Sequence, residues 1–231
     1  RFIMMNLEKA DVPEEMPNEQ LTSADKWILS RVNGVIRDVT DNMEKFELGI
    51  AVQKIYDFIW EEFCDWYIEM VKPRLYSEED TTKAAALWTL KTVLGQALKL
   101  LHPYMPFITE EIYCTLNPQE ESIMISSWPE YRAEWDFAED EQAVEMMKEA
   151  VRAIRTVRTG MNVPPSKKAT VYVVSEKEEV RSVFENGKVF FGTLGYASEV
   201  IVQADKTGIA GDAVSAVLPQ AVIYMPLPSY L

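Results

Sequence analysis

The chain has 231 residues, of which 48% are hydrophobic and 26% charged, the balance of a soluble globular protein rather than of a disordered one. Its only cysteines, Cys64 and Cys114, are too few for a disulfide framework or a four-ligand zinc site, and we expect both to be reduced and partly buried. No apolar run approaches the roughly 20 residues that span a bilayer, and no signal segment opens the chain. These features predict a cytoplasmic protein without a membrane partner.

The first two predicted helices form a hairpin. Thr22 and Ser23 offer cap oxygens for a helix that runs to about Met43. A turn with Phe46 at its tip leads into a central helix, whose core is the segment 55–72. Its aromatic residues recur at helical spacing, which favours core packing, and Pro73 should end it.

Three further helices are predicted to complete an antiparallel bundle. Ser77 and Asp80 resemble a capping box for a third helix that ends near Leu101. The segment 106–116 starts with a proline that suits a first helical turn, and a fifth helix is expected over 138–159. Gly160 suits the left-handed position after it. His102 is interpreted as a helix-end residue bonded to a last-turn carbonyl, since no nucleophile pattern accompanies it.

The pattern changes after Pro164–Pro165. Residues 168–174 and 199–203 predict strands, 178–194 predicts a helical stretch with a break at Asn186–Gly187, and two apolar runs within 213–225 predict a hairpin. The fold class is therefore α+β, an antiparallel helical bundle followed by a small α/β domain. The expected divisions are a linker from an upstream domain (1–20), the bundle (21–160) and the α/β domain (161–231).

The formal net charge of −14 argues against a nucleic-acid partner, but the charge is unevenly distributed. Basic residues dominate 148–168, whereas acidic residues dominate 130–145. Such a polarised molecule can bind RNA on one face and repel it elsewhere. The alternative is that these charges are solvated helix faces.

Four segments together resemble one family. They are ADKWILSRVN at 24–33, Trp60 with FCDWYIE at 63–69, LHPYMPFITEEIY at 101–113, and Arg158 with MNVPPSKK at 161–168. The first three resemble the anticodon-binding region of class I aminoacyl-tRNA synthetases for branched aliphatic amino acids, and the fourth resembles the valyl-tRNA synthetase family. The resemblance implies that the partner is the anticodon stem-loop of tRNA(Val).

The resemblance places anticodon contact in the bundle without settling which residues make it. Exposed positions of the first helix and its turn supply the candidates Lys26, Arg31, Arg37, Lys45 and Phe46. Phe46 could instead pack against the turn. A second cluster suits backbone phosphates, namely Arg152, Arg155, Arg158, Lys167 and Lys168.

The family's enzymes use ATP and Mg, but the two ATP-handling signatures of their catalytic domain do not occur here. The resemblance therefore implies an inactive piece of an aminoacyl-tRNA ligase, without catalytic residues, metal or cofactor of its own, a monomer that acts with an upstream catalytic domain in the same chain. The closing segment 225–231 lacks the charged heptads of the family's C-terminal arm. Two alternatives remain, the equivalent isoleucyl-tRNA synthetase region and a helical protein-interaction scaffold.

Overall fold

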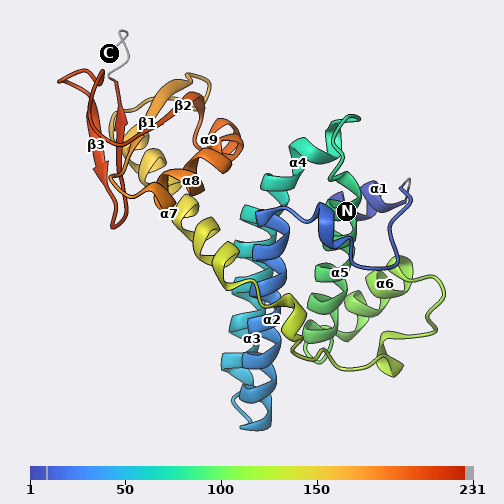
Figure 1. Cartoon of the computed structure of the whole chain (residues 1–231). Coiled ribbons are helices and arrows are strands. Elements are labelled where there is room, and N and C mark those ends of the chain that lie inside the picture. The colour runs from blue at the N-terminus through green and yellow to red at the C-terminus, as the bar shows by residue number, and fades with distance from the viewer. Residues whose placement is uncertain (9, 227–231) are drawn as a thin grey trace. The chain divides into compact units, whose positions relative to one another are not determined.

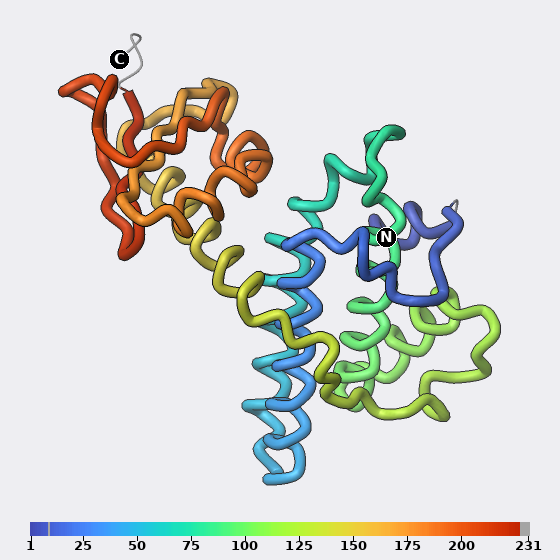
Figure 2. Tube along the Cα trace, in the orientation of Figure 1, coloured from blue at the N-terminus to red at the C-terminus, as the bar shows by residue number. Residues whose placement is uncertain are grey.

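The computed structural model describes residues 1–8 and 10–226, so most of the closing segment lies outside the described residues. The chain divides into two compact units, Arg1–Glu141 and Gln142–Leu231 (Figure 1). The first unit is helical, as expected, and Figure 2 traces its path. Its elements are α1 (Phe2–Leu7), η1 (Asn18–Gln20), α2 (Ser23–Glu44), α3 (Leu48–Asp57), η2 (Phe58–Ile68), α4 (Glu69–Tyr76), α5 (Lys83–Leu101), α6 (Pro106–Leu116), η3 (Ile123–Ile125) and η4 (Ala133–Trp135).

Helix α2 begins at Ser23, about two residues before the predicted start, and Thr22, one of the two predicted caps, is its N-cap. Thr22 and Asp25 form a reciprocal capping box, in which each side chain accepts from the other residue's backbone N–H. The apolar positions of α2, among them Ile28, Val32 and Val39, are fully buried. Helix α3 packs beside it, so the two form the long hairpin visible in Figure 1.

The central helix differs from its prediction in two ways. Segment η2 is a π-helix. It continues into α4, which contains Pro73 and ends only at Tyr76. The wider π-helical turn brings Phe58, five residues before Phe63, into a parallel stack with it, at 6.3 Å between ring centroids. Tyr67 stacks on Phe63 in turn, at 6.0 Å. All three rings are buried in the core.

Tyr56 and Trp60 do not pack in that core. Both were expected to extend the apolar face of the central helix, but they are 57% and 58% exposed. The change to a π-helical period at Phe58 is the physical reason. The wider turn shifts the positions after Phe58 away from the face that a regular 3.6-residue period predicts.

The remaining helices of the first unit follow the predicted boundaries more closely than the predicted caps. Helix α6 spans the expected residues, but α5 begins at Lys83, and Asp80 accepts from the Thr82 backbone N–H at 2.8 Å in a turn rather than in a capping box with Ser77. His102 lies 2.7 Å from the Thr109 hydroxyl through Nδ1, and this contact replaces the expected carbonyl.

The first residues belong to the helical unit rather than to a separate linker. Met4 and Leu7 of α1 pack on a small core formed by α5, α6 and η3, which includes Leu98 and Leu116. One side of α1 is therefore buried against the helical unit.

The second unit contains α7 (Ala138–Gly160) from Gln142 onward and a four-stranded sheet. Its elements are β1 (Ala169–Val174), α8 (Glu178–Asn186), α9 (Lys188–Leu194), β2 (Ala197–Gln203), β3 (Val214–Val217) and β4 (Val222–Met225). The strand order is β2-β1-β4-β3, with β1 parallel to β2 and the β3–β4 hairpin antiparallel as expected. Helices α8 and α9 pack on the β1–β2 part of the sheet (Figure 1).

The division between the units lies after Glu141, whereas the sequence suggested residue 160. The apolar stripe of α7 explains this difference, because Met147 meets Gly187 before α9 and Ile154 meets Gly195 after it. The left-handed residue after α7 is Asn162 (φ +54°) rather than Gly160. Cys64 and Cys114 are free thiols and half-buried, as predicted. Within the described residues, no helix is both long enough and apolar enough to cross a membrane.

Candidate nucleic-acid interface

The turn between α2 and α3 presents an aromatic ring to solvent. Phe46 is 87% exposed and has a left-handed backbone, with φ of +59°. This conformation costs a non-glycine residue about 1–2 kcal/mol, which packing usually offsets. Here no packing does so. The alternative in which Phe46 packs against the turn is therefore not met. The Phe46 ring is available for stacking.

Carboxylates surround this turn. Lys45 donates to Asp41 at 2.7 Å, and this hydrogen bond raises the pKa of Lys45. Glu47 is held by Asn42 at 2.6 Å, while Glu44 is exposed. Phosphate groups are therefore disfavoured at the tip, whereas the flat face of an unpaired base is not.

Arg37 and Lys26 lie elsewhere on α2. The Arg37 side chain is 64% exposed and donates to the neighbouring Asp38 at 3.3 Å, with its guanidinium 5.8 Å from the ring centroid of Tyr131. Lys26 is in the first turn, and its ammonium lies 5.8 Å from the ring of Phe137. Because α2 is 22 residues long, or about 33 Å, Lys26 and Phe46 are not brought together.

Arg31 is already occupied by protein groups. Its Nε and Nη2 donate to the two carboxylate oxygens of Glu62 at 2.7 and 3.0 Å, and Nη1 donates to Glu141 at 3.0 Å. The hydrogen bond to Glu62 raises the pKa of Arg31 further above its ordinary value, against the opposing effect of burial. Arg31 thus joins α2 to the π-helical segment and to the start of α7. Two guanidinium N–H groups remain beyond these three bonds and the side chain is 34% exposed, so an RNA contact would share Arg31 with these carboxylates.

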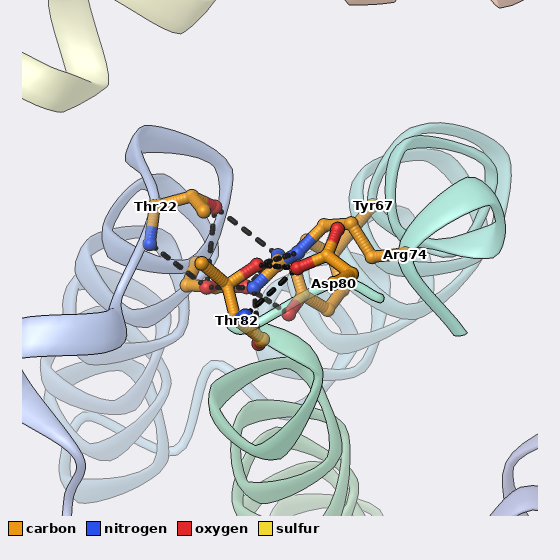
Figure 3. A network of polar contacts seen from close by, with 6 residues as sticks. Thr22, Tyr67, Arg74, Asp80 and Thr82 are labelled. Carbon is orange, nitrogen blue, oxygen red and sulfur yellow. Dashed lines mark hydrogen bonds and ion pairs between the residues drawn. The ribbon is translucent and has the colours of Figure 1, made fainter. Parts of the chain in front are cut away.

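The other end of α2 is fixed by a buried polar network. Asp25 is fully buried and receives two hydrogen bonds from the Arg74 guanidinium, at 2.8 and 2.9 Å, and one from the Tyr67 hydroxyl at 2.6 Å. Arg74 also donates to the Thr82 side chain and backbone carbonyl, at 2.9 and 2.8 Å. Figure 3 shows Tyr67 of η2, Arg74 of α4 and Thr82 at the start of α5 converging near Thr22 at the start of α2.

Each partner in this network supports the charge of another. Burial raises the pKa of Tyr67 well above 10, and the charge of Asp25 raises it further, so Tyr67 remains a donor. Burial lowers the pKa of Arg74, but the hydrogen bonds and charge of Asp25 outweigh it and leave a net rise. The network therefore orients the bundle, and its ionisable groups are satisfied.

In the second unit, two of the predicted arginines have structural partners. Arg158 is 5% exposed and donates to the backbone carbonyls of Pro164 and Lys167, which ties the end of α7 to the loop before β1. Arg155 donates to the Leu194 carbonyl at 2.8 Å. Both guanidiniums lie over the ring of Tyr196, at 5.9 Å for Arg155 and 5.5 Å for Arg158.

The three other basic residues of the predicted phosphate-contact cluster face solvent. Arg152, Lys167 and Lys168 are exposed, and they lie on α7 and on the loop that Arg158 holds. Lys148, by contrast, is buried, and its ammonium pairs with Glu145 at 2.8 Å. Of the predicted phosphate-contact residues, these three are therefore the ones at the surface.

Two exposed aromatic features were missed by the sequence reasoning. Tyr56 and Trp60 stack on one another, with ring centroids 6.4 Å apart and planes 9° apart. Phe107, at the start of α6, is 90% exposed. The only available signal was the acidic stripe beside Tyr56 and Trp60, because a fully buried helix face would not carry Glu61 and Asp65 so close by.

The described residues do not form a metal site. Within residues 1–8 and 10–226, no group of three or more histidine, cysteine, aspartate or glutamate side chains is placed to hold a metal ion.

Comparisons with known proteins agree on one domain type. The model of the anticodon-binding domain of tRNA ligases matches residues 25–173. A valine–tRNA ligase of Clostridium acetobutylicum is 48% identical over 227 residues, which cover 98% of this chain and 26% of the relative. Those of Clostridium tetani and Carboxydothermus hydrogenoformans are 47% and 39% identical, with 26% and 25% of their lengths covered. The chain spans about a quarter of the length of these relatives.

Proposed function

Because the chain belongs to the anticodon-binding domain family of tRNA ligases, we propose that it binds the anticodon stem-loop of tRNA(Val) on behalf of a valine–tRNA ligase. The observation that carries this proposal is the exposed Phe46 ring, held in a left-handed turn at the end of a rigid helical hairpin. Anticodon bases are unstacked, and proteins read such bases by stacking and by contacts to their edges. The turn offers a ring on which a base can stack. Arg37 lies about two helical turns before the end of α2.

Exposed basic residues of the second unit supply the contacts to the RNA backbone in this proposal. Arg152, Lys167 and Lys168 lie at the surface, while Arg158 holds the loop before β1 and Arg155 holds the end of α9. Lys168→Gln should weaken binding to all tRNAs alike and lower the salt slope by about one. Arg158→Ala should instead lower the stability of the loop, because the carbonyls of Pro164 and Lys167 lose the donor that they share.

The direct test compares two exposed aromatic residues of the first unit. Phe46→Ala should weaken binding of the isolated tRNA(Val) anticodon stem-loop by about 1–3 kcal/mol, the range for one stacked base. Tyr76→Ala is the matched control, since Tyr76 is 70% exposed but follows Arg74, which bonds to the opposite end of α2. Equal losses in both variants would refute a base-stacking role for the turn.

The same titration separates the two related tRNA ligases. A tRNA(Ile) stem-loop should bind more weakly than the tRNA(Val) stem-loop, and the reverse order would favour the isoleucyl alternative. The ATP-dependent transfer of valine belongs, in this proposal, to a catalytic domain in the same polypeptide, and the 231-residue chain alone should not aminoacylate tRNA(Val). We also infer a cytoplasmic monomer, because free tRNA is the partner.

A protein-interaction scaffold remains the second candidate, and one observation favours it. Tyr56 and Trp60 form an exposed stack flanked by Glu61 and Asp65, a surface that repels RNA and suits a basic polypeptide. Trp60→Ala should leave stem-loop binding unchanged under the leading proposal. If tRNA(Val) shows no salt-dependent binding at all, the scaffold becomes the better account.

A further inference from the structure

A cavity in the helical unit is lined by two lysines on one side and by several apolar side chains elsewhere. It has a volume of about 400 Å³ and lies between the segment 12–14, helix α5 and helix α6. This volume falls within the range of small-molecule sites. The hairpin turn and the basic loop of the second unit contribute none of its lining residues, so the cavity is separate from the proposed RNA contacts.

The positive wall comes from one face of α5. Lys91, Gly95 and Lys99 are spaced four residues apart, so a helix stacks them along one side, where all three line the cavity. Gly95 leaves the space between the two lysines open, because a Cβ added there would meet no atom within 4 Å. The amide of Gln96 lines the same cavity.

Neither ammonium has a carboxylate partner among the described residues. The Lys99 ammonium lies over the face of Tyr113, at 5.7 Å from ammonium to ring centroid. Burial lowers the pKa of Lys99, the charge of Arg132 lowers it further, and the charge of Glu120 only partly opposes both. Glu14 also lines the cavity but is exposed. The half-buried positive charge is therefore under-compensated in a chain whose acids outnumber its bases.

Apolar side chains contribute to the other walls, together with the polar groups of Thr92, Tyr113 and Asn117. Trp88 is 8% exposed and Leu116 is 6% exposed, and both line the cavity with Val12 and Pro13. An inorganic anion would leave these surfaces wet, whereas a compact apolar group attached to the anion would cover them.

We propose that this cavity binds a small organic anion, a carboxylate or a phosphate monoester carried by a compact apolar group. Lys91 and Lys99 contact the anionic group, and Trp88 and Leu116 contact the apolar group. The proposal does not rest on the proposed tRNA-binding function.

Calorimetric titration of the chain with benzoate, phenyl phosphate and inorganic phosphate tests this assignment. At least one of the two aromatic anions should bind about tenfold more tightly than inorganic phosphate, and the stronger one identifies the preferred headgroup. Lys99→Gln should weaken that binding about tenfold, whereas Lys83→Gln, on the same helix but outside the cavity, should not. Absence of binding by both aromatic anions, or equal binding by Lys99→Gln, would overturn the proposal.

A cavity-filling variant provides the second measurement. Gly95→Leu should abolish binding by occupying the space between the lysines, and Gly34→Leu is its matched control, since Gly34 is a helical glycine of α2 with similarly open surroundings. Far-UV circular dichroism and urea unfolding show whether each variant folds. In parallel, NMR of the lysine side chains should show the pKa of Lys99 rising when the anion binds. An unchanged pKa at saturation would also count against the site.

Discussion

The two ends of helix α2 differ in how their side chains are used. At its start, Asp25 is fully buried, and Arg74, Tyr67 and Thr22 satisfy its carboxylate. At its end, Phe46 is almost fully exposed in a strained backbone conformation that its own ring does nothing to stabilise. One end of α2 is therefore held by buried polar contacts, whereas the other presents an aromatic ring to solvent.

The largest effect should come from breaking the network at the start of α2. Arg74→Ala leaves the Asp25 carboxylate buried without its cation, which should lower the free energy of unfolding by about 3–5 kcal/mol. Tryptophan fluorescence in urea measures this, because all 6 tryptophans lie in the first unit. Lys72→Ala, two residues earlier in the same helix and half-exposed, should change the free energy by less than about 1 kcal/mol. Equal losses would show that the network does not anchor this end.

A smaller loss is expected in the middle of α2. Glu62→Gln weakens the paired hydrogen bonds to Arg31 but leaves Glu141 in place, so stability should fall by about 1–2 kcal/mol. Stem-loop affinity should stay within about twofold of that of the unmodified chain. A clear gain in affinity would instead mean that Arg31, once released, contacts RNA, which would extend the partner-facing end of α2 by several turns.

The sequence predicted the buried end of α2 better than the elements that hold it. The capping pair Thr22 and Asp25 is visible locally, because its members are three residues apart. Arg74 lies 49 residues from Asp25, and Glu62 and Glu141 lie 31 and 110 residues from Arg31. Periodicity carries no information about such distant partners, so Arg31 looked like an exposed base.

The same limit applies to the central helix. A search for 3.6-residue spacing cannot detect a π-helical segment, and it therefore placed Tyr56 and Trp60 in the core and ended the helix at Pro73. By contrast, the strands and the Asn186–Gly187 break were predictable, because β-branched runs and glycine act locally. Phe46 could be identified as a candidate, but its exposure depends on what the rest of the bundle leaves uncovered.

At the exposed end, stability and binding should change in opposite directions. Phe46→Gly relieves the left-handed conformation and should raise the free energy of unfolding by up to about 1 kcal/mol, while removal of the ring weakens stem-loop binding. Urea unfolding and stem-loop titration of the same preparation measure both quantities. A loss of stability would mean that the ring packs against the protein, and the contrast between the two ends of α2 would then be wrong.

The smallest effect should come from the charge beside that ring. Lys45 is paired with Asp41, and Glu44 and Glu47 lie within the same turn, so its attraction for RNA phosphates is largely cancelled. Lys45→Gln should therefore weaken stem-loop binding by no more than about threefold and lower the salt slope by at most about one, the change for one lost phosphate contact. Lys72→Gln, near the opposite end of α2, is the matched control and should change neither quantity. If Lys45→Gln weakens binding as much as Phe46→Ala does, the turn recognises RNA through charge rather than through stacking on an unpaired base, and its carboxylates would then have to move away from the bound strand.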